Sequence, residues 1–97
     1  MATYITLVQF TQQGAQQVKG LPSLVEKNIE NFKKLGVEFR SWHVTMGQYD
    51  IVVVYDAPND ETVAKVALIL GLTGNGRTQS MRAFSLEEFK KITSSLP

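Results

Sequence analysis

The sequence contains no cysteine and a single histidine, His43, among its 97 residues. The absence of cysteine excludes a disulfide framework, a thiolate zinc site and a cysteine nucleophile. A lone histidine also excludes a multi-histidine metal site within one subunit. No metal ion and no other cofactor are therefore expected.

An excess of charge of one sign is lacking as well. Ten Lys and Arg residues stand against nine Asp and Glu residues, and the formal net charge is +1. This balance provides no basic field for a phosphate backbone, and no acidic tail is present. Nucleic acid is therefore not an expected partner.

The chain also has no apolar run near the roughly 18–20 residues that a membrane helix needs. The longest apolar segments are Ile51–Tyr55 and Val66–Leu70. The first residues, Met1–Tyr4, carry no basic region of the kind that begins a secretory signal. A cytoplasmic protein without membrane attachment is the expectation.

Hydrophobic residues make up 43% of the chain, which is typical of a globular protein and argues against disorder. The length predicts a single domain over residues 1–97. Changes in apolar spacing predict alternating strands and helices. The expected strands are Tyr4–Phe10, Val37–Met46, Tyr49–Asp56 and Arg77–Phe84. The expected helices are Leu21–Leu35, Asp60–Leu70 and a short last helix that carries Leu86, Phe89 and Ile92.

Several residues predict where these elements begin and end. The pairs with capping-box spacing are Ser23 with Glu26 and Ser85 with Glu88. Gly36 is expected to end the first helix, and Gly47 to take part in the turn between the second and third strands. The polar segment Thr11–Gln17 is interpreted as a connection with one loose helical turn. The expected buried side of the middle helix consists of Val63, Ala64, Ala67, Leu68 and Leu70.

The element order β-α-β-β-α-β with a C-terminal helix is that of a ferredoxin-like α+β fold with a four-stranded antiparallel sheet. In the strand order 4-1-3-2 the first and third strands are central. Ile51–Tyr55 is apolar on both faces, although the helices cover only one. Each such side chain left in water would forgo roughly 1.5–3 kcal/mol. We therefore expect a homodimer in which two sheets pack face to face, a dimeric α+β barrel; the alternative is scattered surface apolar residues.

The hairpin segment Thr45–Val52 contains Gly47, Tyr49 and Asp50 in the pattern Gly-x-Tyr-Asp. Together with Gly71–Phe84 and the ending Phe89-Lys90-Lys91-Ile92, it resembles the GYD domain family of small prokaryotic proteins, over essentially the whole chain. The resemblance implies the dimeric ferredoxin-like barrel and assigns no substrate or catalytic residue. Proteins of similar architecture include cofactor-independent monooxygenases, haem-degrading enzymes and amino-acid-sensing domains, but shared architecture does not assign an activity.

Candidate ligand-binding residues are aromatic or basic side chains on the strands and at the hairpin. They are Tyr4, Trp42, His43, Tyr49 and Arg82. His43 is the candidate general base or haem ligand, with an edge-strand histidine bonded to a neighbour as the alternative. On the second strand, alternation places Phe39, Ser41, His43 and Thr45 on one face and Arg40, Trp42, Val44 and Met46 on the other.

The polar residues near the turns each have two interpretations. Tyr49 and Asp50 are either a pair that orients a substrate or, as favoured, a structural signature in which Asp50 accepts backbone N–H bonds across the hairpin turn. Arg82 is either a fork for a carboxylate or phosphate, or an ion-pair partner of Asp50, Asp56 or a second subunit. The segment Gly74–Thr78 is either an anion-binding nest or, as favoured, a flexible connection.

Three functions remain open from the sequence. The first is a homodimeric module, or a higher homo-oligomer, that binds or senses a small organic acid or aromatic compound between sheet and helices. The second is a cofactor-independent monooxygenase-like or isomerase-like enzyme with His43 as acid or base. The third is a structural oligomerisation module. The sequence favours binding over catalysis, because it offers one histidine and no paired carboxylates on an inner face.

Overall fold

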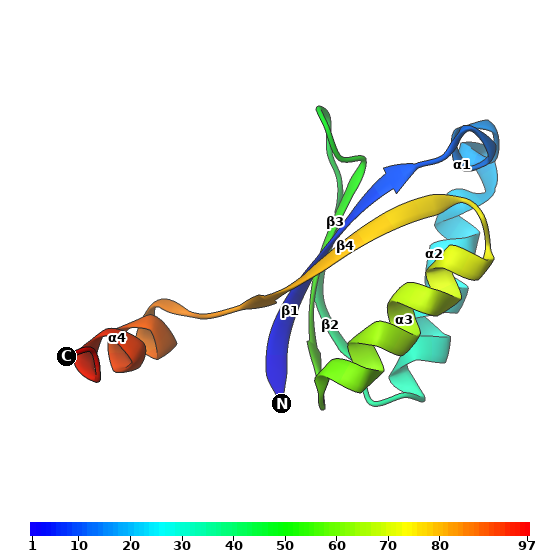
Figure 1. Cartoon of the computed structure of the whole chain (residues 1–97). Coiled ribbons are helices and arrows are strands. Elements are labelled where there is room, and N and C mark those ends of the chain that lie inside the picture. The colour runs from blue at the N-terminus through cyan, green and yellow to red at the C-terminus, as the bar shows by residue number, and fades with distance from the viewer.

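The computed structural model describes residues 1–97 and has an α+β architecture (Figure 1). The strands are β1 (Ala2–Phe10), β2 (Glu38–Val44), β3 (Ile51–Ala57) and β4 (Gly76–Ala83). The helical elements are α1 (Gln12–Gln16), the 3-10 turn η1 (Val18–Gly20), α2 (Leu21–Lys33), α3 (Asp60–Leu72) and α4 (Leu86–Ser94). The expected strands and helices are all present, with bounds that differ by only a few residues.

The four strands form one antiparallel sheet in the order β2-β3-β1-β4. This order confirms the ferredoxin-like α+β fold predicted from the sequence. Helices α2 and α3 lie against one face of the sheet, whereas α4 projects away from the body beyond the end of β4 (Figure 1). The other face of the sheet, called the open face below, has no layer of helices from this chain.

The hydrophobic core lies between the sheet and α3, and it continues to the C-terminal end of α2. Its buried members are Tyr4, Phe32, Val37, Val53, Tyr55, Ala57, Val63 and Val66. Aromatic rings link the layers, since Phe39 lies 6.3 Å from Phe32 and 5.9 Å from Tyr55 between ring centroids. Ring pairs at such distances stabilise a core beyond their buried area.

The buried side of α3 differs in part from the expected one. Thr62, Val63 and Val66 are buried, while Ala64 is exposed and Leu68 retains 69% of its accessible surface. The positions of alanine and leucine do not identify the buried side of α3, because so apolar a helix has more than one face that could be buried. The expectation for Ala64 and Leu68 was wrong for that reason.

Helix ends follow the expected chemistry at two of three places. Ser85 and Glu88 form the predicted capping box at α4. Ser23 does not cap α2, because η1 leads directly into the helix and Gly20 is already the N-cap residue. Gly36 has φ of 89° after α2 and Gly47 has φ of 109° in the hairpin, left-handed values that favour glycine.

A β-bulge in β2 changes the faces expected for that strand. The pairing with β3 shifts register between Phe39 and Ser41. As a result, Phe39 pairs with Tyr55 and Trp42 pairs with Val53. An extra residue in one strand reverses the alternation beyond it. Phe39 and Trp42 therefore share the helix-covered face, which corrects the sequence-based assignment of Phe39 to the face of His43.

Helix α1 is docked against the loop before β4 and is not the loose turn expected for this segment. The Thr11 hydroxyl donates to the carbonyl of Gly74 at 2.6 Å, and the Thr11 backbone N–H donates to the carbonyl of Asn75 at 3.1 Å. Gly14 is buried against the same loop, where a Cβ would lie 1.8 Å from the carbonyl oxygen of Asn75. These contacts, called the α1 latch below, hold α1 against that loop.

We expect Gly14→Ala to destabilise the fold, because the added methyl group meets backbone atoms that cannot move independently of β4. The expected loss in the free energy of unfolding is about 1–3 kcal/mol, as for other overpacked sites. Gly71→Ala in α3 is the matched control, since a Cβ there meets nothing within 4 Å. It should be neutral or stabilise by about 0.5–1 kcal/mol. Chemical denaturation of the two variants checks this, and equal stabilities would contradict it.

Candidate functional site

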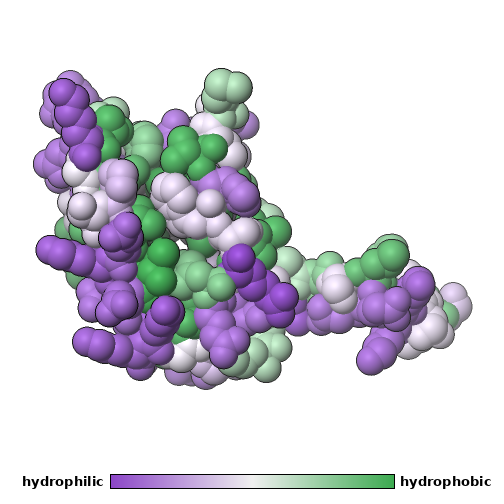
Figure 2. Space-filling model, turned by 180° about the vertical axis from the view of Figure 1, so that it is seen from behind, coloured by the Kyte–Doolittle hydropathy of each residue, from purple (hydrophilic) through white to green (hydrophobic).

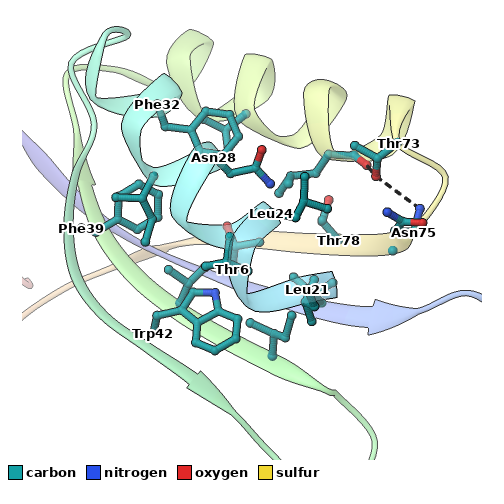
Figure 3. Close-up of a pocket in the computed structure, with 18 of the residues that line it drawn as sticks. Thr6, Leu21, Leu24, Asn28, Phe32, Phe39, Trp42, Thr73, Asn75 and Thr78 are labelled. Atoms are coloured by element: carbon teal, nitrogen blue, oxygen red, sulfur yellow. Dashed lines mark hydrogen bonds between the residues drawn. The ribbon is translucent and has the colours of Figure 1, made fainter. Parts of the chain in front are cut away.

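A pocket lies between α2 and the helix-covered face of the sheet (Figure 3). Its volume is about 90 Å³. The sheet contributes residues from all four strands, among them Thr6, Trp42, Val53 and Thr78. Fourteen of its twenty lining residues are hydrophobic, which is typical of small-molecule sites.

Helix α2 forms the wall of the pocket opposite the sheet. Its lining residues are Leu21, Leu24, Val25, Asn28, Ile29 and Phe32. Only Phe32 is buried, and the other five are half-exposed, although they form the face of α2 that points at the sheet. The helix is therefore seated at its C-terminal end and stands away from the sheet along the rest of its length.

The polar groups of the pocket are few and uncharged. The Thr6 hydroxyl lies 2.8 Å from both the Tyr55 and the Ser80 hydroxyls, so its hydrogen bonds are made within the protein. The Asn28 side chain points from α2 into the pocket and has no hydrogen bond to the residues drawn with it (Figure 3). None of the twenty lining residues is Asp, Glu, Lys, Arg or His.

The open face of the sheet is a second apolar surface. The cross-strand pairs Ile5 with Val54, Leu7 with Val52 and Ile5 with Met81 place these five side chains together. None of the five is buried. The expected doubly apolar character of β1 and β3 is thus present, with one face in the core and the other uncovered.

Helix α4 with the residues before it forms a projecting arm, visible in Figure 2 as an extension that carries hydrophobic residues. Leu86 retains 68% and Phe89 55% of its accessible surface. The arm is held by Arg82, whose guanidinium donates to the Thr3 carbonyl at 3.1 Å, pairs with the Glu88 carboxylate at 3.2 Å and stacks on Phe84. The ion-pair partner of Arg82 is thus Glu88, and neither Asp50 nor Asp56.

The five candidate ligand residues lie in different places. Trp42 is the one that lines the pocket. The Tyr4 hydroxyl donates to Asp60, a bond that together with burial raises the pKa of Tyr4 above its usual value. His43 is exposed and lies opposite Val52 on the open face. The Tyr49 hydroxyl donates to the side-chain carbonyl of Gln79 at 2.8 Å, outside the pocket.

Sequence reasoning missed most of the pocket, including Asn28. The sequence feature that could have indicated the pocket is the amide of Asn28. It lies on the otherwise apolar face of the helix that carries Leu21, Val25, Ile29 and Phe32. A polar residue at such a position is unusual, because that face of a surface helix normally packs against the core.

The profile of the GYD domain matches residues 4–93. The chain belongs to the GYD domain family. A relative from Thermus thermophilus, named glutamine synthetase and cystathionine beta-lyase binding protein, is 32% identical over 89 residues. The match covers 91% of this chain and 94% of the relative.

Two solved structures resemble this GYD domain in fold. One is a protein from Thermus thermophilus, with a TM-score of 0.56 at 23% identity, covering 88% of this chain and 95% of that one. The other is a hypothetical protein from Pyrococcus horikoshii, with a TM-score of 0.53 at 17% identity, covering 88% and 92%. In this GYD domain no helix is long and apolar enough to cross a bilayer.

The signature of the GYD family ties the β2–β3 hairpin to β1. The Asp50 carboxylate accepts the backbone N–H of Phe10 at 2.7 Å, and the Asp50 N–H donates to the Val8 carbonyl at 2.8 Å. The Thr45 hydroxyl donates to the Tyr49 carbonyl at 2.7 Å and closes the turn. Asp50 thus accepts a backbone N–H bond, but from β1 and not across its own turn.

The segment Gly74–Thr78 of this GYD domain is engaged by the α1 latch. The carbonyls of Gly74 and Asn75 accept the two bonds from Thr11, and the Gln13 side chain donates to the Asn75 amide oxygen at 3.1 Å. The segment is therefore a docked loop at one end of the pocket. The expectation of a flexible connection was wrong, because no residue within the segment itself indicates that α1 binds it.

Asp56 is the ionisable group most firmly held in the sheet. Its carboxylate accepts from the Arg40 guanidinium at 2.7 Å and from the Thr3 hydroxyl at 2.6 Å. The bond from Arg40 first, and that from Thr3 second, hold the pKa of Asp56 below its usual value. A lowered pKa means that the folded state binds a proton less readily than the unfolded state.

We expect Asp56→Asn to flatten the acid dependence of stability. The contribution of Asp56 is present above the unfolded pKa of about 3.9 and is lost as the pH falls through the lower folded value. At pH 7 the variant should be less stable by on the order of 1 kcal/mol, and the difference should vanish in strong acid. Chemical denaturation between pH 2 and pH 7 measures this, with exposed Glu30→Gln as control. Parallel stability curves for Asp56→Asn and the parent would contradict it.

Proposed function

We propose that this GYD-domain protein is a homodimeric module that binds a small ligand in the pocket between α2 and the sheet. The observation that carries the proposal is that pocket, which is apolar and is bounded on one side by a helix seated at only one end. Trp42 is the one sequence-predicted ligand residue that contributes to it.

The physical argument rests on the incomplete packing of α2. Leu24, Val25 and Ile29 face the sheet, yet they remain half-exposed. Each square ångström of apolar surface left in water costs about 25 cal/mol relative to burial. A ligand in the pocket would bury these side chains together with those of the sheet, and that burial is the driving force for binding.

Two apolar surfaces that do not meet within one chain support the dimer. The open face presents Val52 and Val54, and the arm presents Phe89, each without a covering element. Interfaces of permanent dimers are apolar and resemble a core divided in two. A second copy, placed with its sheet against the open face, covers the first surface, and the arm extends the contact.

Ligand binding is tested with toluene, which carries no polar group and consists of a single substituted ring. Trp42 is the only tryptophan, so its indole N–H signal in a ¹H–¹⁵N NMR spectrum reports on the pocket wall. We expect a saturable shift of this signal in the parent protein. Val25→Phe, which fills the pocket, should weaken binding at least tenfold, whereas Glu26→Gln on the exposed side of α2 should not change it. No saturable shift in the parent would overturn the proposed function.

The dimer is tested by native mass spectrometry and sedimentation. The parent should have twice the mass of the chain or a multiple of it. Val54→Lys, which places a charge at the centre of the open face, should yield folded monomers by circular dichroism. Leu68→Lys, at an exposed apolar position of α3, is the matched control and should leave the mass unchanged. A monomeric parent protein would refute the dimer.

A second candidate function is protein binding, favoured by the name of the Thermus thermophilus relative. On this hypothesis the module binds a metabolic enzyme, and the arm with Leu86 and Phe89 is the exposed apolar surface available for it. Enzymes of that kind act in the cytoplasm, which is also where we place this protein. Enzymatic catalysis by His43 is less favoured, because this side chain lies on the open face and not in the pocket.

A further inference from the structure

The pocket contains one amide side chain, that of Asn28, that makes no hydrogen bond within the protein. Asn28 lies in the middle of α2, between Leu24 and Phe32 on the pocket side. Asparagine is a weak helix former and contributes little to apolar packing. Its amide points into the pocket without a hydrogen bond to the residues around it (Figure 3).

Apart from the Thr78 hydroxyl, which like the Asn28 amide makes no hydrogen bond within the protein, the other polar side chains of the pocket are engaged within the chain. Thr6 is bonded to two hydroxyls, and the Thr73 hydroxyl donates to the Leu70 carbonyl at 2.7 Å. The amide oxygen of Asn75 accepts from Gln13. No fully buried side-chain nitrogen or oxygen lacks a partner, so the unbonded Asn28 amide retains accessible surface. It can both donate and accept a hydrogen bond.

The charge of the lining selects among ligands as well. A carboxylate or ammonium group in this pocket would meet no opposite charge, because all twenty lining residues are uncharged. Transfer of an unpaired ion into such surroundings is strongly unfavourable. Lys19 lies in an adjoining hollow near Leu21 and is not among the lining residues.

The size of the pocket sets the remaining limit. A volume of about 90 Å³ is several times the ~10–15 Å³ that one water molecule needs, and smaller than the ~150 Å³ of an engineered cavity that takes benzene. A single ring is the size of compound that this volume holds when one edge extends toward the opening, where the adjoining hollow shares Leu21, Leu24 and Asn75 with the pocket.

We infer that the ligand is a neutral, single-ring compound with one hydroxyl or carbonyl group, and that Asn28 is the residue that recognises this group. The ring lies against Trp42 and the aliphatic side chains, and the polar group exchanges hydrogen bonds with the Asn28 amide. This inference rests on the proposed ligand-binding function and goes beyond it by naming the ligand class and the residue that determines specificity. It also separates the ligand from organic acids, which the sequence alone left open.

The test compares three single-ring probes that differ in one substituent: toluene, phenol and benzoate. The NMR signal of the Trp42 indole gives their dissociation constants for the parent protein. Phenol should bind about threefold to tenfold more tightly than toluene, the range expected for one net hydrogen bond, and benzoate should not bind measurably.

The decisive variant is Asn28→Leu, with Asn31→Leu on the exposed side of α2 as matched control. Asn28→Leu should remove the advantage of phenol over toluene while toluene binds as tightly as before or more tightly. Asn31→Leu should preserve the parent preference. Circular dichroism confirms that both variants are folded.

The outcomes separate this inference from the proposed function on which it rests. If toluene binds the parent but phenol has no advantage, or if Asn28→Leu leaves that advantage intact, the inference is wrong and the pocket still binds ligands. Benzoate binding as tight as that of phenol would refute the neutral ligand class. If no probe binds the parent, the proposed function itself fails.

Discussion

The seating of α2 at its C-terminal end, with α1 docked separately before it, is the constraint on which the rest of the structure depends. At the C-terminal end, Phe32 is buried in the aromatic cluster with Phe39 and Tyr55. At the N-terminal end, the α1 latch binds the chain to the loop before β4. The helix therefore contacts the sheet closely only at Phe32, and its N-terminal part stands away from the sheet. The pocket is the space that this geometry leaves, so it is a property of the fold and not a local packing defect.

The two faces of the sheet therefore differ in what covers them. The helix-covered face combines a close-packed core near Tyr55 with the pocket under the N-terminal part of α2. The open face has no covering layer from this chain, although its central side chains are aliphatic. Arg82 lies at the border between the body and the arm, where its bonds to Thr3 and Glu88 give α4 a defined direction. A surface that is already ordered loses less conformational entropy when a partner binds.

Much of the fold could be predicted from the sequence, because period and helix-cap chemistry act locally. The strands, the capping box at Ser85 and the turn at Gly47 follow from neighbouring residues, and the strand order follows from the order of the elements along the chain. The bulge after Phe39 could not be predicted, since it depends on the pairing with β3. The docking of α1 through Gly14 depends on a backbone carbonyl far along the chain, at Asn75. Prediction of the pocket would have needed both the bulge and the docking of α1. For that reason the predicted ligand residues other than Trp42 lie outside it.

The bulge in β2 also affects how copies of this chain can associate. β2 is an edge strand, and its outer edge would otherwise offer free backbone groups to the strand of a neighbouring molecule. The irregular backbone at Arg40, together with the exposed charges of Glu38 and Arg40, interrupts that edge. Regular strand addition, the first step of sheet-extending aggregation, is disfavoured there. An apolar sheet face is thus present next to an edge strand that resists uncontrolled polymerisation.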